Sequence, residues 1–457
     1  MASAANPHAG MTIRSLERFE KTGRLYTDGN RLWSHSIIGA GYIPMYSRQM
    51  DLLSLISNPN GTSRIELARA TGKSPAKIGK LIQRLVNAGV LTQEEPIETS
   101  RGRRPILLRP SQGLGYLLGV DIGMIHLRVV LTDMRGTILR SIEQPSNARA
   151  DLDTALKAIL DAIDSLLADY GVPRDKLRAI GISHSGGIDP KSGVCLYWHL
   201  AMHWKGVPLK KLFSDYYGVP ALVDDSVHCM ALAEKTFGAA LSTDTFILIN
   251  VGQGIRSGLF IDGQLFRGAE GIAGELGHTT ILPGGPRCSC GNRGCLESLA
   301  SGKSIMDATM AALGDNVTTS LQEIASHDPA GITVDAISAA ARGGDRLARR
   351  IISQAGSYLG IAVANLINLL NPPLIVFAGG TIAAAEELLM ETIIREASAS
   401  AFEVAFTKTK IVRSPLDNFA AARGAALLVT KPALKEFWNK VITPGSKSAR
   451  ATSPGLA

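Results

Sequence analysis

The sequence predicts an α/β protein in two parts, a winged helix-turn-helix followed by a larger body of two similar lobes. Charge separates the parts: the 457-residue chain has a net charge of +8, and residues 1–110 carry 16 Lys and Arg against 8 Asp and Glu. The rest of the chain carries 32 of each kind, so the whole basic excess lies in the first quarter. A strand–turn–strand pattern that occurs at 116–145 and again at 246–265 predicts the duplicated body.

The composition is that of an ordinary soluble globular protein, with 45% hydrophobic and 19% charged residues. The first ten residues, MASAANPHAG, lack the apolar core of a secretory signal. The best candidate for a membrane span is interrupted by three asparagines: Asn365, Asn368 and Asn371. We therefore expect a cytoplasmic protein without a membrane partner.

Residues 49–110 have the pattern of three helices and a wing. An apolar helix around 52–56 ends at the breaker NPNG, and Ser63 can cap a short second helix. Gly72 makes the turn that follows. Ser74 caps a third helix, with a proline at the favoured first position. This order of elements is typical of a winged helix-turn-helix.

The third helix carries two stripes. Apolar residues at i, i+3, i+4 and i+7 predict its buried face: Ile78, Leu81, Ile82 and Leu85. Polar and basic residues at its start and along another face suit the major groove of DNA: Lys73, Ser74, Lys77, Lys80 and Arg84. Two strands then enclose the turn TSRGRR, whose arginines are well placed for phosphates or the minor groove: Arg101, Arg103 and Arg104.

Two other interpretations of the basic part are a protein-interaction domain with a solvated basic face and a polybasic segment for a membrane surface. Charge segregation together with the order helix, turn, helix and wing favours DNA binding. Residues 1–48 have no assignment. The tail 431–457, which ends in TPGSKSARATSPGLA, is expected to be disordered.

Three of the five cysteines fall within eight residues, in the pattern Cys-x-Cys-x4-Cys, ten positions after a histidine. Three thiolates and one imidazole complete a tetrahedral set for zinc: His278, Cys288, Cys290 and Cys295. Gly291 and Gly294 allow the tight turns that this requires. A closed four-ligand site predicts a structural zinc, and the alternatives are a redox cluster or three buried thiols.

The motifs of the body resemble those of the ROK family of repressors and sugar kinases, over roughly residues 50–430. They are Asp121-x-Gly123, SGGID (185–189), DD (224–225), GELGH (274–278) and CSCGNRGCLE (288–297). The resemblance implies an actin/hexokinase-like ATPase fold in two lobes over 111–430, with a zinc loop at 274–298. It also implies a homo-oligomer, a dimer or a dimer of dimers, and a winged helix in the repressor members.

The resemblance further implies a sugar site in the cleft between the lobes. Family members bind zinc through the positions of the histidine and the three cysteines named above. The matching sugar-binding positions are Gly187, Asp224, Asp225, Glu275, His278 and Glu297. Asp225 matches the aspartate that serves as the base in the kinases of the family.

Two phosphate loops and one sugar position depart from the kinase pattern. Met124 stands where the kinases have Gly, and bulk there blocks close approach of backbone to phosphate. Ile125 stands where they have Thr or Ser and offers no hydroxyl. In GQGIRSG (252–258) Gln253 replaces the usual Thr, and Arg256 and Ser257 replace usual glycines. Asp224 replaces the usual Asn, and a carboxylate accepts but cannot donate a hydrogen bond.

We therefore predict a transcription regulator, a repressor of carbohydrate-metabolism genes, with no catalytic residue. It binds operator DNA and responds to a sugar or a sugar phosphate. One alternative is a sugar kinase with an added DNA-binding domain, in which Asp225 is catalytic. A second alternative is a zinc-stabilised interaction protein without a small ligand.

Overall fold

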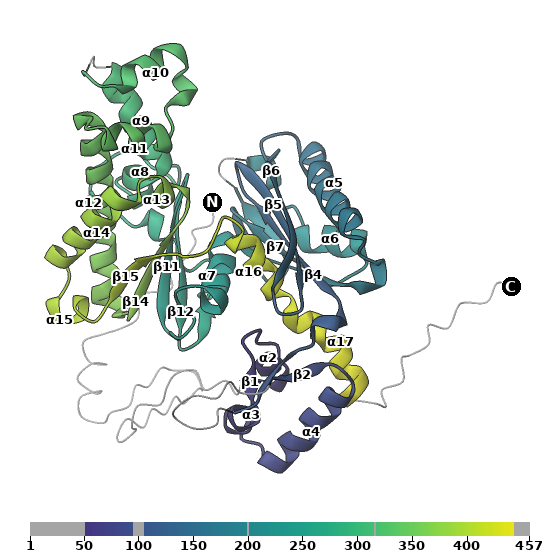
Figure 1. The fold of residues 1–457 in the computed structure, drawn as a ribbon. Helices are drawn as coiled ribbons and strands as arrows, with labels where there is room; N and C mark the ends of the chain where they lie inside the picture. Colours follow the sequence, from purple (N-terminus) through teal and green to yellow (C-terminus); the bar gives the residue numbers. More distant parts are fainter. Residues whose placement is uncertain (1–50, 95–104, 199–200, 315–316, 443–457) are drawn as a thin grey trace, which may run out of the picture. The chain divides into compact units, whose positions relative to one another are not determined.

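The described N-terminal part is a winged helix-turn-helix, as predicted. The computed structural model describes residues 51–94, 105–198, 201–314 and 317–442. Three helices pack beside a sheet of strand order β1-β3-β2 (Figure 1). The helices are α2 (Leu52–Ile56), α3 (Arg64–Thr71) and α4 (Pro75–Asn87). The strands are β1 (Thr62–Ser63), β2 (Leu91–Glu94) and β3 (Leu107–Pro110).

Local hydrogen bonds define the ends of these helices. Ser63 and Glu66 form a capping box at the start of α3, and Gly72 ends that helix with φ 65°. The side chain of Ser74 accepts a hydrogen bond from the backbone N–H of Lys77 at the start of α4. The predicted apolar stripe of α4 is buried at three positions and half-buried at Leu81; the buried three are Ile78, Ile82 and Leu85.

The first lobe contains a five-stranded sheet of order β10-β7-β4-β5-β6. In chain order, the first three strands (β4, β5 and β6) pair antiparallel, and the last two (β7 and β10) join the sheet in parallel. They are β4 (Tyr116–Ile122), β5 (His126–Asp133), β6 (Ile138–Pro145), β7 (Leu177–His184) and β10 (Ala221–Asp225). Helices α5 (Leu152–Tyr170) and α6 (Leu209–Tyr217) pack on this sheet, and β8 (Gly187–Asp189) pairs with β9 (Val194–Tyr197) (Figure 1).

The second lobe repeats this sheet, with the order β13-β12-β11-β14-β15. Again three antiparallel strands are followed by two parallel ones, which confirms the predicted duplication. The strands are β11 (Phe246–Val251), β12 (Ile255–Ile261), β13 (Gln264–Phe266), β14 (Leu374–Ala378) and β15 (Lys410–Arg413).

Helices fill the remainder of the second lobe. The longest are α12 (Arg346–Leu370) and α14 (Glu386–Ser400), which pack against each other. The others are α8 (Leu296–Ala300), α9 (Gly302–Gly314), α10 (Leu321–His327), α11 (Val334–Arg342), α13 (Gly380–Ala384) and α15 (Glu403–Phe406). Within the described ranges no helix, α12 included, combines the length and apolar character needed to cross a membrane.

Helices α7 (Ser226–Phe237) and α16 (Ala420–Leu428) lie directly against each other, and α16 also covers strands of the first lobe. Glycines make this close packing possible. A Cβ added to Gly181 would lie 1.7 Å from the carbonyl oxygen of Ala425, and one added to Gly424 would lie 1.7 Å from the carbonyl oxygen of Cys229. The last segment of the fold therefore returns to the first lobe.

The expectation of disorder from residue 431 is wrong for residues 431–442, because they belong to helix α17 (Thr430–Ile442). Its buried Ala433 and Leu434 join an apolar cluster that includes winged-helix residues such as Leu52 and Leu85. Phe437 adds an aromatic face on which the guanidinium of Arg178 lies, 4.9 Å from the ring centroid. Residues 431–442 are therefore ordered by tertiary packing, because the apolar side of α17 contacts residues that are distant in the sequence. Residues 1–48 and 443–457 lie outside the described residues.

Candidate functional site

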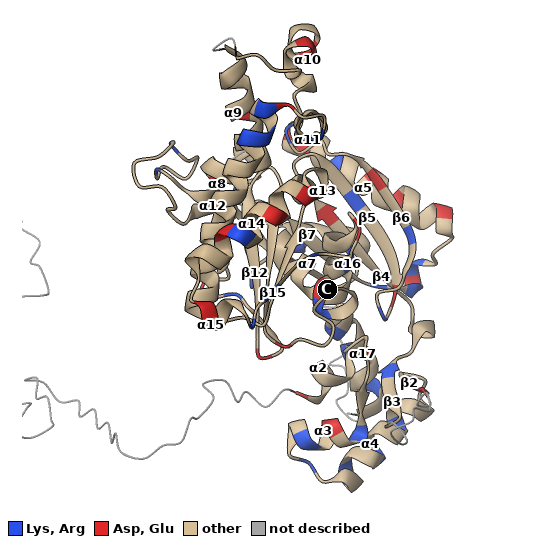
Figure 2. Cartoon of the chain, turned by 60° about the vertical axis from the view of Figure 1, so that its left-hand side comes forward, with Lys and Arg blue, Asp and Glu red and all other residues tan. Residues whose placement is uncertain are grey.

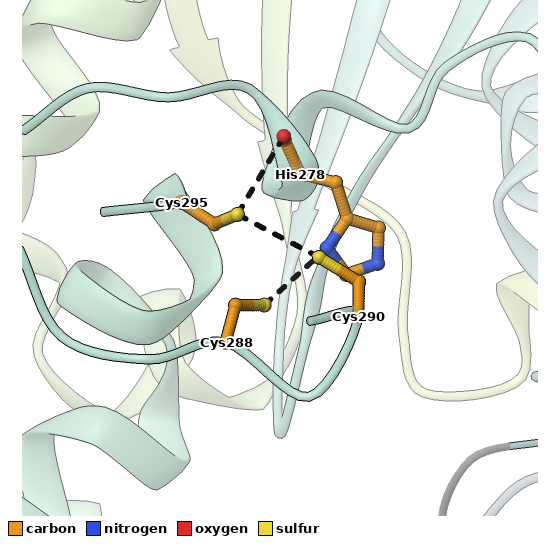
Figure 3. Close-up of side chains that lie close together, drawn as sticks. All are labelled: His278, Cys288, Cys290 and Cys295. Carbon is orange, nitrogen blue, oxygen red and sulfur yellow. Dashed lines mark hydrogen bonds between the residues drawn. The ribbon is translucent and has the colours of Figure 1, made fainter. Parts of the chain in front are cut away.

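The predicted metal ligands come together in one cluster (Figure 3). The ligand atoms of His278, Cys288, Cys290 and Cys295 all lie within 4.8 Å of one another. The Cys288 sulfur is 3.6 Å from Nδ1 of His278, and the sulfurs of Cys290 and Cys295 are 3.8 Å apart. A tetrahedral ion with metal–sulfur distances of about 2.3 Å has ligand atoms roughly 3.8 Å apart. The described residues therefore have both the chemistry and the spacing of a four-ligand metal site.

Backbone turns at two glycines bring the sulfurs together. Gly291 has φ 96° and Gly294 has φ 70°, which side-chain-bearing residues rarely adopt. A Cβ on Gly294 would also lie 1.7 Å from the carbonyl oxygen of Leu282. Both positions therefore require glycine, as the sequence predicts.

One thiol of this cluster, that of Cys295, is difficult to ionise without a nearby cation. Burial, followed by the neighbouring sulfurs of Cys290 and Cys288, raises the pKa of Cys295 to about 12. A bound dication favours thiolates strongly, so metal binding would release protons from this loop.

The histidine of the cluster has a second side that faces away from the sulfurs. Its Nδ1 faces Cys288, whereas its Nε2 lies 3.8 Å from Oε2 of Glu275. Coordination through Nδ1 therefore leaves His278 with an N–H at Nε2, directed toward the Glu275 carboxylate. The metal loop and the predicted sugar ligands thus share one residue.

An arginine of the second lobe joins two of the predicted sugar-binding carboxylates. Arg256 in β12 donates from Nη1 to Oδ2 of Asp225, and its Nη2 lies 2.9 Å from Oε1 of Glu275. The hydroxyl of Tyr197 donates to the same Oε1 at 3.1 Å. Asp225 ends β10 in the first lobe, so Arg256 links the two sheets across the site.

Asp224, predicted as a sugar ligand, is committed to protein partners. Arg267 donates to its Oδ2 from Nε at 2.9 Å and from Nη2 at 2.6 Å, and Nδ1 of His228 lies 2.8 Å from its Oδ1. Burial alone would raise the pKa of Asp224, but the His228 hydrogen bond and the Arg267 charge outweigh it and hold the pKa below its ordinary value. The side chain is only 2% exposed, and through Arg267 it makes a contact between the two lobes.

Two other predicted sugar residues hold neighbouring groups in position. A Cβ on Gly187 would lie 2.3 Å from the ring of Tyr197, so the glycine makes room for that ring. Glu297 is half-buried, and its Oε2 accepts a hydrogen bond from the backbone N–H of Ile255 at 3.0 Å. Glu297 therefore joins the metal loop to the start of β12.

His184 is a buried polar residue beside the SGGID motif that the sequence analysis did not single out. Its Nδ1 accepts a hydrogen bond from the backbone of Gly186 at 2.8 Å, and its Nε2 is buried without a partner in the described part of the chain. The ring contacts Trp198 and Trp204, with centroids 4.5 and 5.5 Å away. Burial lowers the pKa of His184 to about 3, so the ring is neutral at physiological pH. The only signal in the sequence was its place directly before SGGID, at the end of a predicted buried strand that the structure shows as β7.

The aspartate of the first turn that matches a phosphate-binding loop is held by protein contacts. Ser183 donates to Oδ1 of Asp121 at 2.6 Å, and Arg128 lies 3.7 Å from the other oxygen. Burial raises the pKa of Asp121 despite these partners. Ile125 is 50% exposed at the turn where a hydroxyl residue is expected in a kinase. Arg256, one of the departures in the second loop, contacts the carboxylates of Asp225 and Glu275.

The predicted DNA-binding residues divide into three groups. Four are exposed on α4 or at its start, where Figure 2 marks basic positions in blue: Lys73, Ser74, Lys77 and Lys80. Arg84 is exposed as well, but its Nη2 donates to the carbonyl of Val441 in α17. Three lie outside the described residues: Arg101, Arg103 and Arg104.

The ROK family model matches residues 117–432, which include both lobes and the metal loop. The chain belongs to the ROK family. Its similarity to curated ROK proteins extends beyond that region. The chain is 30% identical to the xylose repressor of Caldicellulosiruptor bescii, over 80% of this chain and 91% of that protein. It is 31% identical to the transcriptional dual regulator NagC of Escherichia coli, over 82% of this chain and 90% of NagC.

Solved ROK structures include a regulator and kinases. A ROK family transcriptional regulator described as a homologue of the E. coli MLC protein is 31% identical, with a TM-score of 0.70 over 86% of this chain and 98% of that chain. The ROK glucokinase of Streptomyces griseus, solved with glucose and AMPPNP, is 29% identical, with a TM-score of 0.59 over 69% of this chain and 99% of that chain. The family and the fold class are thus confirmed. The two matches differ in coverage: the regulator matches 86% of this chain and the kinase 69%.

Proposed function

We propose that this ROK protein is a sugar-responsive transcription regulator, most simply a repressor of carbohydrate-metabolism genes. The observation that carries the proposal is the presence, in one chain, of a winged helix with an exposed basic helix and a two-lobed ROK body. The curated relatives described above are regulators of transcription, and two sugars appear in the names of such relatives, xylose and N-acetylglucosamine.

DNA contact would come from the exposed start of α4, with its N-terminal turn in the major groove. Lys77 and Lys80 supply charge for phosphates, and Ser74 and Lys73 stand where base edges or phosphates are reached. We extend this interface to the wing arginines Arg103 and Arg104 on the basis of the sequence. A homodimer, or a dimer of dimers, would place two such helices on a two-fold operator.

A sugar or a sugar phosphate would bind beside the metal loop. His278, Glu275 and Glu297 offer one donor and several acceptors for hydroxyls, and Gly187 supports the Tyr197 ring that holds Glu275. We propose that the metal is a structural zinc, because four protein ligands leave no position for a reacting water. The zinc would fix the direction of the imidazole and of the loop that carries Glu297.

The alternative of an active sugar kinase is less well supported. Phosphoryl transfer needs a free base and loops that admit phosphate oxygens. Asp225, the residue at the base position, is paired with Arg256, and the first turn carries Met124 and Ile125. We therefore assign no catalytic residue.

The last two helices offer a route from the sugar site to DNA. Helix α16 packs on β4 and β7, and α17 continues from it to contact α2 and α4. A change in the angle between the lobes that moves α16 would also move α17, and with it the basic helix. A coupling of about 1–3 kcal/mol, or 5–150-fold in DNA affinity, is ordinary for such two-site systems.

The test is a panel of neutral sugars and sugar phosphates with Mg-ATP, scored for release of operator DNA and for nucleotide turnover. We expect at least one compound to change DNA affinity fivefold or more without turnover. Sugar-dependent turnover would assign the chain to the kinases. If no compound changes the affinity for DNA, the proposal that the protein senses a sugar is wrong.

A further inference from the structure

The sugar site contains a cation of its own at one end. Arg256 occupies a position where the kinase pattern has glycine, and its side chain reaches Asp225 and Glu275 at once. It is 17% exposed, so water does little to solvate its charge. A guanidinium in that setting must keep carboxylate partners, because a buried unpaired charge is strongly disfavoured.

Both oxygens of Asp225 already accept a hydrogen bond from the protein. Its Oδ1 accepts the backbone N–H of Val227 at the start of α7, and its Oδ2 accepts from Arg256. The hydroxyl that a ROK kinase would phosphorylate must donate to this carboxylate. In this chain that hydroxyl would have to compete with the guanidinium for Asp225, either by sharing the carboxylate or by displacing the side chain.

Glu275 is different, because only one of its oxygens is taken. Oε1 forms an ion pair with Arg256 and accepts a hydrogen bond from the Tyr197 hydroxyl, whereas Oε2 is buried without a hydrogen-bond partner among the described residues. That oxygen lies 3.8 Å from Nε2 of His278. A buried acceptor without a donor, next to an imidazole N–H, is a place where a ligand hydroxyl can form two hydrogen bonds.

We propose that Arg256 is the residue that determines sugar specificity: it closes the Asp225 end of the site, so that the effector is recognised at the metal-loop end by Glu275, His278 and Glu297. This inference rests on the proposed function of sugar sensing. The nearby Arg267 cannot substitute for Arg256, because it is bound to Asp224.

The chemical class of the effector follows from this arrangement. An aldohexose has an exocyclic hydroxymethyl group at the end that a kinase phosphorylates, and here that group meets Arg256. The pentopyranose of the same ring configuration lacks the group and avoids this competition. The site is therefore built for a sugar without a hydroxyl donor at the Asp225 end, a pentopyranose.

Matched pairs of sugars test this directly, because they differ only in the hydroxymethyl group: D-glucose and D-xylose, D-galactose and L-arabinose, D-mannose and D-lyxose. Affinities are measured by calorimetry on the full-length protein without DNA. We expect the wild type to bind the pentose of at least one pair at least tenfold more tightly than its hexose. In Arg256→Gly the affinity for that hexose should rise at least tenfold, while the affinity for the pentose changes less than threefold.

Two further variants separate exclusion from loss of structure. Arg256→Lys keeps a cation and should keep the preference for the pentose, whereas Arg256→Gln keeps length without charge and should weaken the preference. Thermal unfolding and the content of bound metal show whether each variant folds. If Arg256→Gly fails to fold, the hexose and pentose affinities of Arg256→Gln are compared with those of the wild type in its place. The proposal is overturned if the ratio of hexose affinity to pentose affinity stays within threefold of the wild-type ratio in both Arg256→Gly and Arg256→Gln.

An anionic ligand is the decisive competing outcome. If the wild type binds D-glucuronate more tightly than D-xylose and Arg256→Gly loses that binding, then Arg256 is a direct partner of the ligand and the exclusion proposal is wrong. Failure of all six neutral sugars to bind either protein also overturns it. DNA release by a compound outside the panel would nevertheless leave the proposed regulatory function intact.

Discussion

Arg256 and Asp225 form an ion pair that joins β12 of the second lobe to the end of β10 in the first. The preceding aspartate repeats the arrangement, since Arg267 from the second lobe binds Asp224. Two successive aspartates of one lobe are therefore held by two arginines of the other. The predicted site is thus a junction between lobes, where each of the two aspartates is paired with an arginine of the opposite lobe.

The Asp224–Arg267 pair should stabilise the fold in a pH-dependent way. Asp224→Asn should lower the free energy of unfolding at pH 7 by about 2–4 kcal/mol, toward the lower part of the range for breaking a buried pair because Arg267 is 32% exposed. Denaturant unfolding measures the difference. A loss below about 0.5 kcal/mol would contradict the structural role.

The sign of the pH dependence follows from the lowered pKa of Asp224. Unfolded aspartate titrates near about 3.9, so the stabilisation is complete above that pH. It is lost as the pH falls through the lower pKa of the folded state. The difference between wild type and Asp224→Asn should therefore be constant from pH 5 to pH 8 and shrink in strong acid, and a difference that grows on acidification would contradict this assignment.

The metal loop should bind about one zinc per chain, as a closed four-ligand site does. Cys290→Ser removes a thiolate and should lose most of the metal, measured by elemental analysis of the purified protein. Cys195→Ser is the matched control, because Cys195 is a buried free cysteine outside the cluster. Equal metal content in both variants would exclude the predicted ligand set.

The basic helix should contribute to DNA affinity through phosphates. The double variant Lys77→Ala/Lys80→Ala should weaken operator binding roughly tenfold or more and reduce the slope of log affinity against log salt by about 2. Lys157→Ala/Lys303→Ala is the control, since both lysines are exposed on the body. If the two double variants have the same salt slope, α4 does not contact the backbone of DNA.

The wing can be tested in the same assay. Arg103→Ala/Arg104→Ala should also weaken operator binding and flatten its salt dependence, because fewer counterions are released. Unchanged affinity would remove the wing from the interface and leave α4 as the only proposed contact.

Helix α17 should be required for DNA binding as well as for stability. Leu434 is fully buried in the cluster shared with the winged helix, so Leu434→Ala should cost about 2–5 kcal/mol and lower DNA affinity. Leu369→Ala provides the control, because Leu369 is 80% exposed. Unfolding and DNA titrations are compared for both. A normal melting temperature in Leu434→Ala would mean that α17 does not hold the winged helix.

The amino-acid sequence by itself determined the features that depend on neighbours along the chain. The caps at Ser63 and Ser74 form with residues three positions away, and the Cys-x-Cys-x4-Cys spacing brings three thiols to one loop. The duplicated strand order also followed from local alternation and turns, and family motifs indicated the sugar-site residues.

Only the tertiary structure decided what the long side chains and the last helix contact. The partners of Arg256 lie 31 and 19 positions away in sequence, on Asp225 and Glu275, and a flexible guanidinium could equally have faced a phosphate. Asp224 is satisfied by Arg267 from the opposite lobe, which no local pattern indicates. Helix α17 is ordered because its apolar stripe finds partners more than 300 residues earlier in the chain. These contacts depend on how two sheets and a winged helix pack in space, and sequence spacing alone carries no information about that packing.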